Sequence, residues 1–98
     1  MRLRHIEVFQ AVLQAGSVSG AARLLNVSQP NVSRVLNHAE QQLGFTLFDR
    51  TPQGLIVTPE GRRLMPEVEA LFSHIQAIGE LAEQLRQGEG QHLSLIHI

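Results

Sequence analysis

The sequence predicts a mainly α-helical fold, in which three short helices and a β-hairpin are followed by one long helix. Three observations predict it. Apolar residues recur at helical spacing in three segments before residue 44, turn residues precede a short apolar run at 55–57, and an unbroken seven-residue apolar repeat runs from 64 to 85. With 98 residues, 43% of them hydrophobic, the chain suffices for one small core plus an extension.

The first helix is expected close to the N-terminus. Leu3, Ile6, Phe9 and Leu13 recur at spacings of three and four, and Gly16 follows where a helix would end. We expect this helix to support the core through that apolar stripe.

Two further helices follow, joined by a short turn. Ser17 or Ser19 can cap the second helix, which is expected to end near Asn26, and Ser28 can cap a third helix that begins at about Gln29. The second helix carries small residues that allow close packing in its apolar strip, which consists of Val18, Ala21, Ala22, Leu24 and Leu25.

The apolar residues of the third helix share one stripe, so its outward face can be identified. The buried stripe is predicted to consist of Val32, Val35, Leu36, Ala39 and Leu43. The opposite face is polar and nearly uncharged, and comprises Pro30, Arg34, Asn37 and Gln41, with Gln29 and Ser33 on the flank nearest the helix start. Two short helices joined by a tight turn, the second with a free polar face, have the layout of a helix-turn-helix that reads DNA.

A hairpin is predicted after Gly44, which ends the third helix. Apolar anchors at Phe45, Leu47 and Phe48 lead to a turn at 51–54 and then to the apolar run. Such a hairpin beside a helix-turn-helix would be a wing. We therefore expect residues 1–58 to form a winged helix-turn-helix domain.

The long helix is expected over residues 59–87, because Thr58 can cap it and Pro59 and Glu60 suit its first turn. It would be roughly 43 Å long, which is too long for the small domain formed by residues 1–58 to cover. Its apolar seam consists of Leu64, Val68, Leu71, Ile75, Ile78, Ala82 and Leu85. A second copy of the chain is the simplest partner, in parallel or antiparallel orientation, and pairing is expected to be best after Pro66, which should kink the helix or loosen its first turns.

Residues 88–98 are expected to be a linker and a tail. The last nine residues alternate like a strand but have nothing after them with which to pair. Residues 93–98 resemble the translated end of a transposon used as a sequencing adapter, so we expect them to carry no information about the fold.

Charge is distributed unevenly along the chain, whose net charge of −1 is unusual for a nucleic-acid binder. Residues 1–63 hold seven arginines and four acidic residues, whereas residues 64–98 hold one arginine and five acidic residues. Every basic residue is arginine, whose planar guanidinium suits bidentate contacts with phosphate or guanine. The positive part is therefore expected to meet DNA, although Arg23, Arg62 and Arg63 are equally compatible with ordinary solvated charges.

Several classes of function are disfavoured. The absence of cysteine excludes disulfides and thiolate metal sites, and no apolar run reaches the length of about 18 residues that a membrane span requires. A cytoplasmic protein without a membrane partner is expected. No metal site and no enzymatic activity are expected, because no glycine-framed nucleophile turn is present and because metal-ligand spacing is lacking among His5, His38, His74, His92 and His97.

Taken together, the motifs resemble one family. They are Ser-x-Ser-x-Ala-Ala-x-Leu-Leu at 17–25, Ser-Gln-Pro-x-Val-Ser at 28–33, Leu-Gly at 43–44, Leu-Phe-x-Arg at 47–50 and Thr-Pro-Glu-Gly at 58–61. In this order they resemble the LysR-type transcriptional regulators over residues 1 to about 90. The resemblance implies a winged helix-turn-helix followed by a linker helix that pairs with its twin in a homodimer.

The resemblance also implies which residues meet double-stranded DNA. The helix that looks like residues 29–42 enters the major groove, and the matching positions for base contacts are Gln29, Pro30, Ser33 and Arg34. Glutamine can pair with adenine, proline can touch a thymine methyl, and arginine can bind guanine or phosphate. Contacts that touch or orient phosphates are expected from Ser28, Asn31, Arg50 and Thr58, although capping alone would equally explain Ser28.

The wing departs from the family pattern. Many relatives carry a basic residue at its tip, whereas this chain has Gln53 beside Gly54. Glutamine can still read an A·T edge in the minor groove.

Full-length relatives also carry a C-terminal domain that binds a small-molecule effector, and the resemblance implies no cofactor within these residues. The function expected is a sequence-specific, DNA-binding transcriptional regulator that acts as a dimer. The alternative is a helical dimerisation or protein-interaction module without DNA binding, which the net charge and Gln53 keep open. Salt dependence of duplex binding would separate the two.

Overall fold

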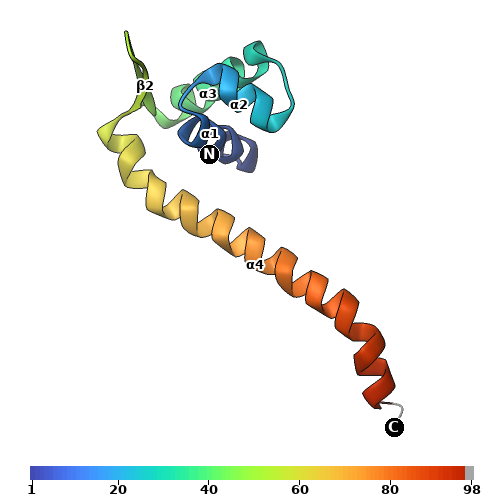
Figure 1. Ribbon diagram of the computed structural model, residues 1–98. Coiled ribbons are helices and arrows are strands. Elements are labelled where there is room, and N and C mark those ends of the chain that lie inside the picture. Colours follow the sequence, from blue (N-terminus) through green and yellow to red (C-terminus); the bar gives the residue numbers. More distant parts are fainter. Residues whose placement is uncertain (97–98) are drawn as a thin grey trace. The chain divides into compact units, whose positions relative to one another are not determined.

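A computed structural model describes the backbone of residues 1–96 and the side chains of residues 1–88. The elements follow one another as α1 (Leu3–Ala15), α2 (Val18–Leu25), α3 (Gln29–Leu43), β1 (Phe48–Thr51), β2 (Gly54–Val57) and α4 (Pro59–Ile96). Helices α1, α2 and α3 lie together, with the hairpin beside them (Figure 1). The chain divides into two compact units, Met1–Val68 and Glu69–Ile98. The predicted mainly α-helical, winged helix-turn-helix architecture is confirmed.

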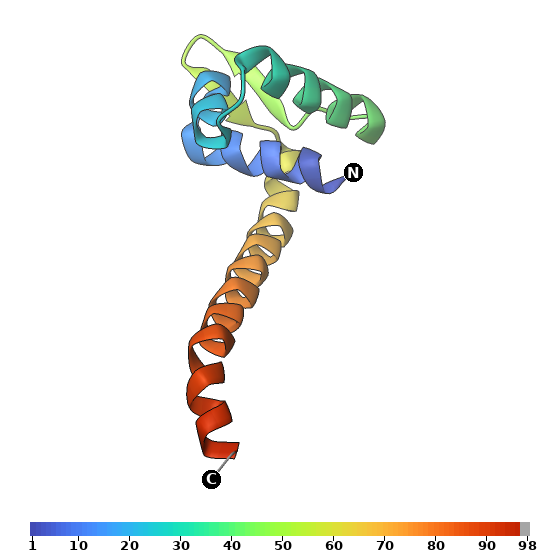
Figure 2. The same cartoon turned by 90° about the vertical axis from the view of Figure 1, so that its right-hand side faces the viewer.

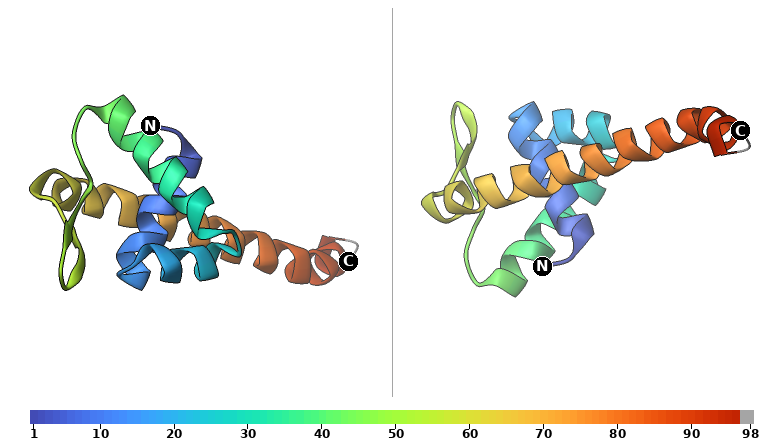
Figure 3. Two further views of the ribbon diagram at one scale, coloured as in Figure 1. Left: turned by 90° about the horizontal axis from the view of Figure 1, so that it is seen from above. Right: turned by 90° about the horizontal axis from the view of Figure 1, so that it is seen from below.

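The core lies where the first three helices meet. Helix α1 contacts both α2 and α3, and α3 crosses α1 when the first unit is viewed from above (Figure 3). The largest fully buried side chains are Phe9, Leu47, Val8, Val12 and Val32. Because all of them are apolar, their removal from water is the main favourable term in folding this unit.

The predicted stripe of α1 is wrong in its details. The helix buries His5, Val8, Phe9 and Val12, together with Ala11, whereas Leu3 is 56% exposed. The buried residues also recur at helical spacing, but the stripe includes a histidine, which a search for apolar residues alone passes over. Phe9 belongs to both stripes and is fully buried.

The predicted caps are confirmed. The Ser17 hydroxyl accepts a hydrogen bond from the Gly20 backbone N–H at 3.0 Å, and the Ser28 hydroxyl accepts one from the Asn31 N–H at 3.3 Å. Helix α2 ends at Asn26, which adopts a left-handed conformation with φ of 58°. These contacts satisfy backbone groups that helix ends leave without an intrahelical partner.

Helix α3 is amphipathic as expected. Val32, Leu36 and Ala39 are buried, and the flanking Val35 and Leu43 are half-buried. The helix ends at Gly44 with φ of 82°. Since the buried stripe faces α1 and α2, the opposite face of α3 is left to solvent.

The predicted hairpin is present as an antiparallel pair in which Phe48 lies opposite Val57 and Thr51 lies opposite Gly54. Phe48 belongs to the core, because it is 8% exposed and the centroid of its ring lies 5.4 Å from the ring centroid of Phe9. The hairpin is thus attached to α1 at its first residue.

Two side chains hold the start of the hairpin in place. The Glu40 carboxylate accepts hydrogen bonds from the backbone N–H groups of Leu47, at 2.6 Å, and Phe48, at 3.3 Å. The Thr58 hydroxyl donates to the Thr46 carbonyl oxygen at 2.7 Å and accepts from the Gly61 N–H at 3.0 Å. Hydrogen bonds to a charged group are among the stronger ones, so Glu40 links α3 firmly to β1.

Helix α4 begins at Pro59, as predicted, and its first turn lies against the chain before β1. Gly61 is buried there, and a Cβ added to it would lie 2.7 Å from the Leu47 carbonyl oxygen and 2.8 Å from a Val57 methyl group. Only glycine fits at this position without displacing the backbone.

The end expected for the long helix at residue 87 is wrong, since α4 continues through Ile96 and appears as one continuous coil (Figure 2). The expected linker and strand-like tail are therefore helical as far as residue 96. The physical reason is that the two glycines of this segment, Gly88 and Gly90, cost a helix only about 1 kcal/mol each, which is too little to end it. Residues 97–98 of the expected tail lie outside the described residues. Pro66 lies within α4 and does not end it.

The predicted seam of α4 divides into two parts. Val68 is buried within the single chain, and Leu64 and Leu71 are half-buried. Further along, Ile75 is 43% exposed and Ile78 is 56% exposed, and Ala82 and Leu85 are exposed as well. The first part is therefore buried or half-buried within the single chain, and the second part is exposed.

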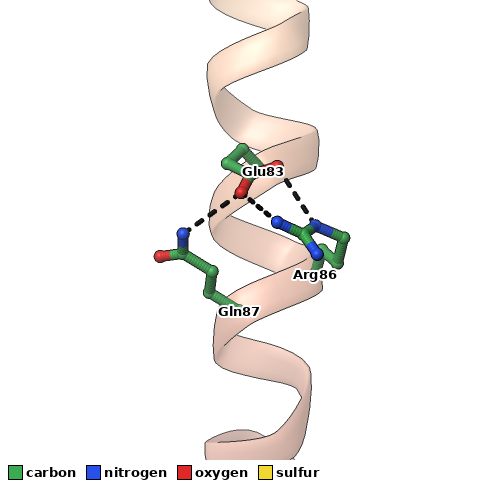
Figure 4. A network of polar contacts seen from close by, with 3 residues as sticks. All are labelled: Glu83, Arg86 and Gln87. Carbon is green, nitrogen blue, oxygen red and sulfur yellow. Dashed lines mark hydrogen bonds and ion pairs between the residues drawn. The ribbon is translucent and has the colours of Figure 1, made fainter.

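A local polar network lies on α4 in the second unit. Glu83 accepts hydrogen bonds from the guanidinium of Arg86 and from the side-chain amide of Gln87 (Figure 4). The hydrogen bonds from Arg86 lower the pKa of Glu83 below its ordinary value. Pairs at this spacing support an exposed helix, each to a small extent.

His5 is the buried polar residue of α1, with 5% of its surface exposed. Its Nδ1 accepts a hydrogen bond from the Arg2 backbone N–H at 3.0 Å, and its Nε2 lies 3.2 Å from Nδ1 of His38 on α3. Burial lowers the pKa of His5 below 6.5, and the facing His38, the N-terminal ammonium and Arg2 lower it further.

We predict opposite effects for the same substitution at two glycines of α4. Gly61→Ala should destabilise the fold by about 1–3 kcal/mol, because the methyl group meets a carbonyl oxygen in a close-packed site. Gly79→Ala is the matched control: nothing lies within 4 Å of its added Cβ, so the helix should gain about 1 kcal/mol. Urea denaturation followed by circular dichroism measures both, and a stabilising Gly61→Ala would contradict the packing described.

We predict that His5 makes the fold sensitive to acid. The folded state disfavours protonated His5, whereas the unfolded chain protonates it near 6.5. Because the unfolded state then binds more protons, the free energy of unfolding should be fully retained above about pH 6.5 and should decrease as the pH falls below it.

Thermal unfolding from about pH 8 to about pH 5 tests this, with His5→Gln expected to flatten the pH profile. His74→Gln, at an exposed position of α4, should keep the wild-type profile. Parallel profiles for wild type and His5→Gln would show that His5 is not the group responsible.

Candidate nucleic-acid interface

The outward face of α3 carries the four residues for which base contacts were predicted. Gln29, Pro30 and Arg34 are exposed, and Ser33 is half-buried. Pro30 stands in the first turn of α3, where its missing N–H costs no hydrogen bond. These residues therefore share one accessible surface at the N-terminal half of the helix.

A first hollow, here called the hairpin hollow, lies on one side of this face. It is lined by the start of α2, by Gln29 and by the hairpin residues Arg50, Thr51 and Gly54. Ser17 and Ser19 contribute their hydroxyl groups from the N-terminal end of α2. The structure thus brings Arg50 to Gln29, although 20 residues separate them in the sequence, and places both beside the positive end of a helix dipole.

A second hollow, here called the N-terminal hollow, involves the other side of α3. It is formed between the beginning of α1 and α3, and it shares Pro30, Ser33 and Arg34 with the outward face. Its remaining lining consists of Arg2, Arg4, His5, Val35, Asn37, His38 and Gln41. No aspartate or glutamate is among the residues that line it.

The four residues predicted to touch or orient phosphates occupy different environments. Ser28 is exposed and caps α3, and Arg50 is exposed on β1. Asn31 is half-buried, and within the described side chains its Oδ1 is a buried oxygen without a hydrogen-bond partner.

Thr58 is only 2% exposed, and its hydroxyl is used twice within the chain. A hydroxyl so enclosed cannot reach a phosphate. The predicted phosphate contact of Thr58 is therefore wrong, and its hydroxyl instead caps α4. The capping role was predictable from the sequence, because threonine before proline is a signal for the start of a helix.

The tip of the hairpin is formed by Pro52 and Gln53, both exposed. Gly54 has φ of 121°, a conformation that favours glycine, and the Thr51 hydroxyl donates a hydrogen bond to its carbonyl oxygen at 2.8 Å. Gln53 is thus held at the tip by a turn of fixed geometry.

The charges of this surface are available to an anion. Arg34 and Arg50 form no ion pair with a carboxylate in the described part of the chain, where the two ion pairs are Arg4 with Glu7, at 3.9 Å, and Arg86 with Glu83. Free guanidinium groups near an uncharged polar helix face suit a ligand that is anionic at its edges and hydrogen-bonding at its centre.

Sequence reasoning missed three residues that shape this surface. Glu40 entered only the count of acidic residues in 1–63, and His5 and His38 were considered only as metal ligands. A signal for His5 was present, because it falls three, four and seven residues before the buried Val8, Phe9 and Val12. No comparable signal marked Glu40, whose two acceptor contacts depend on the fold.

Two other kinds of site find no support in the described residues. They contain no group of three or more histidine, aspartate or glutamate side chains that could hold a metal ion. None of the helices described is both long and apolar enough to cross a membrane.

Comparison with known proteins identifies the family. Residues 3–62 match the family described as bacterial regulatory helix-turn-helix proteins of the lysR family. The regulator DgcR of Pseudoalteromonas sp. is 47% identical over 95 residues, and the transcriptional activator LysR of Escherichia coli K12 is 43% identical over 95 residues. Both alignments cover 97% of this chain but only 33% and 30% of the relatives. The chain therefore spans about a third of the length of these relatives.

Solved structures agree with this assignment. The BenM DNA-binding domain in complex with catB site 1 DNA has a TM-score of 0.78 at 31% identity, covering 90% of this chain and 99% of that chain. The DNA complex of the CbnR DNA-binding domain has a TM-score of 0.72 at 28% identity, covering 88% and 99%. The protein belongs to the lysR family of bacterial helix-turn-helix regulators, and the residues described here form its winged helix-turn-helix DNA-binding domain.

Proposed function

We propose that this chain is the DNA-reading part of a sequence-specific transcriptional regulator, with α3 in the major groove and the hairpin near the minor groove. One observation carries the proposal: α3 buries Val32, Leu36 and Ala39 and leaves an accessible polar face. That two neighbouring structures are DNA complexes supports it. The alternative of an interaction module without DNA binding finds no such support.

The proposed base contacts follow from side-chain chemistry. Gln29 can make a bidentate pair with adenine, Pro30 can contact a thymine methyl group, and Arg34 can form a fork to guanine. Ser33, half-buried next to Arg34, can donate or accept a single hydrogen bond at a base edge.

The proposed phosphate contacts lie at the borders of this face. Arg50 and Ser28 are both exposed. Arg50 lines the hairpin hollow together with Gln29, and Ser28 directly precedes Gln29 in the sequence. Asn31 can orient the start of α3 toward the DNA backbone. Such contacts hold a protein in register without specifying sequence. Gln53 at the hairpin tip would read an A·T edge in the minor groove.

We also propose that the chain binds DNA as a homodimer through the exposed part of the α4 seam. Ile75, Ile78 and Leu85 are 43%, 56% and 63% exposed, and each would bury apolar surface against a second copy. One recognition helix per half-site would then suit a two-fold-related DNA site.

The remainder of the proposal concerns the whole regulator. Most of the length of the relatives lies outside this alignment, and a small-molecule effector would bind there rather than in the described domain. The relatives named above are regulators rather than enzymes, so we propose a non-enzymatic protein that acts on the chromosome in the bacterial cytoplasm.

DNA binding itself is tested by salt dependence. A protein that neutralises several phosphates should lose duplex affinity steeply as salt increases, with log K falling by about 0.9 per phosphate for each unit of log salt. Failure to bind any duplex at low salt would instead support the interaction module.

We predict different effects for two arginines of the interface. Arg34→Ala should weaken binding to a preferred duplex by about 1–3 kcal/mol and relax the preference at one or two bases, because it removes a base contact. Arg50→Ala should weaken binding to all duplexes about equally and reduce the salt slope by about 1.

Gel-shift titrations with a preferred duplex and with unrelated duplexes measure both effects. Arg86→Ala, which removes an exposed arginine of α4, is the control and should change neither preference nor slope. If Arg34→Ala and Arg50→Ala also change neither, the roles assigned to them are wrong.

We predict that a charge in the exposed seam produces monomers. In Ile75→Asp or Ile78→Asp a carboxylate would be buried without a partner in the dimer, which is strongly unfavourable. Ser73→Asp, on the opposite face of α4 and exposed, should remain dimeric. Light scattering gives the mass of each variant, and an unchanged dimer of both isoleucine variants would refute this seam.

A further inference from the structure

The N-terminal hollow is a positively charged site, and its residues Arg2, Arg4 and His38 take no part in the base and phosphate contacts proposed above. Arg2 and Arg4 from the beginning of α1 meet Arg34 and His38 from α3 around it. Arg4 shares its charge with Glu7 at 3.9 Å, whereas Arg2 and Arg34 form no ion pair among the described side chains. With no carboxylate in its lining, the hollow favours an anion.

The hydrogen bonds beneath the hollow fix which ring nitrogens carry protons. A backbone N–H can only donate, so Nδ1 of His5, which lies 3.0 Å from the Arg2 nitrogen, must accept. Neutral His5 therefore carries its proton on Nε2 and donates it to Nδ1 of His38, 3.2 Å away.

The consequence for His38 follows from its tautomer. Because Nδ1 of neutral His38 accepts from His5, its own proton must sit on Nε2. His38 is exposed and lines the hollow, so its Nε2–H is a donor with no described partner within the chain. The two hydrogen bonds that begin at the Arg2 backbone N–H thus leave the Nε2–H of His38 as the donor that faces the hollow.

We propose that the N-terminal hollow binds a phosphodiester group of the DNA backbone, with the Nε2–H of His38 as a hydrogen-bond donor and Arg2 and Arg34 supplying positive charge. The proposal rests on the DNA-binding function proposed above and extends it to a contact from α1 and the middle of α3. A duplex is the favoured source of the phosphate, because Pro30, Ser33 and Arg34 line both the hollow and the face proposed to read bases.

The proposal separates the roles of hydrogen bonding and charge. His38→Ala should lower duplex affinity about fivefold, the value of one hydrogen bond of about 1 kcal/mol, without changing the salt slope, because the lost donor is neutral. His38→Gln should bind nearly as wild type, since its side-chain amide supplies a donor at a similar distance. Arg2→Gln should reduce the slope by about 1.

The decisive experiment neutralises one phosphate at a time in a preferred duplex with methylphosphonate linkages. At one backbone position, neutralisation should weaken the wild-type complex about fivefold or more and should weaken the His38→Ala complex by a smaller factor, because only the charge contribution of Arg2 and Arg34 is then left to lose. His74→Gln, outside the hollow, should reproduce the wild-type profile, and circular dichroism should show that every variant is folded.

The outcomes distinguish this proposal from the proposed function. If wild type binds DNA with a steep salt dependence but the His38→Ala profile matches it at every phosphate, the hollow does not bind DNA phosphate and the DNA-binding function stands. If wild type binds no duplex, both fail. A third arm titrates inorganic phosphate into the free protein at constant ionic strength: saturable shifts of the His38 ring resonances that the duplex does not compete away would assign the hollow to free phosphate and overturn the DNA assignment.

Discussion

The burial of Val32, Leu36 and Ala39 against α1 and α2 determines which side chains α3 presents to solvent. These three apolar residues fix the rotation of the helix about its own axis, since turning it would expose them to water. Gln29, Pro30 and Arg34 are accessible as a consequence. Core packing therefore determines which side chains are available to a base edge, and the chemistry of those side chains determines which contacts they can make.

The same packing sets the position of the hairpin. Glu40 extends from α3 to the backbone of Leu47 and Phe48, and the ring of Phe48 packs near that of Phe9. Thr58 and Gly61 then tie the start of α4 to this segment. The hairpin hollow and the N-terminal hollow are both lined by α3 together with an element packed against it. The positions of their arginines relative to one another therefore depend on the same core packing.

Much of this fold could be predicted from sequence, because local signals and long-range packing agree. Ser17, Ser28 and Gly44 mark helix ends by their own backbone chemistry, and the stripe of α3 follows from its periodicity. Prediction failed where two choices were locally equivalent. Helix α1 has two plausible stripes, and the buried one contains a histidine. Glu40, Thr58 and the His5–His38 pair act through partners distant in sequence, which spacing alone cannot reveal.

Selection of bound duplexes from a random DNA pool would show whether the outward face of α3 reads base sequence in a dimer. We expect enrichment of two copies of one short half-site related by a two-fold axis, spaced by about one helical turn or a multiple of it. A bound pool indistinguishable in sequence from the starting pool would contradict it.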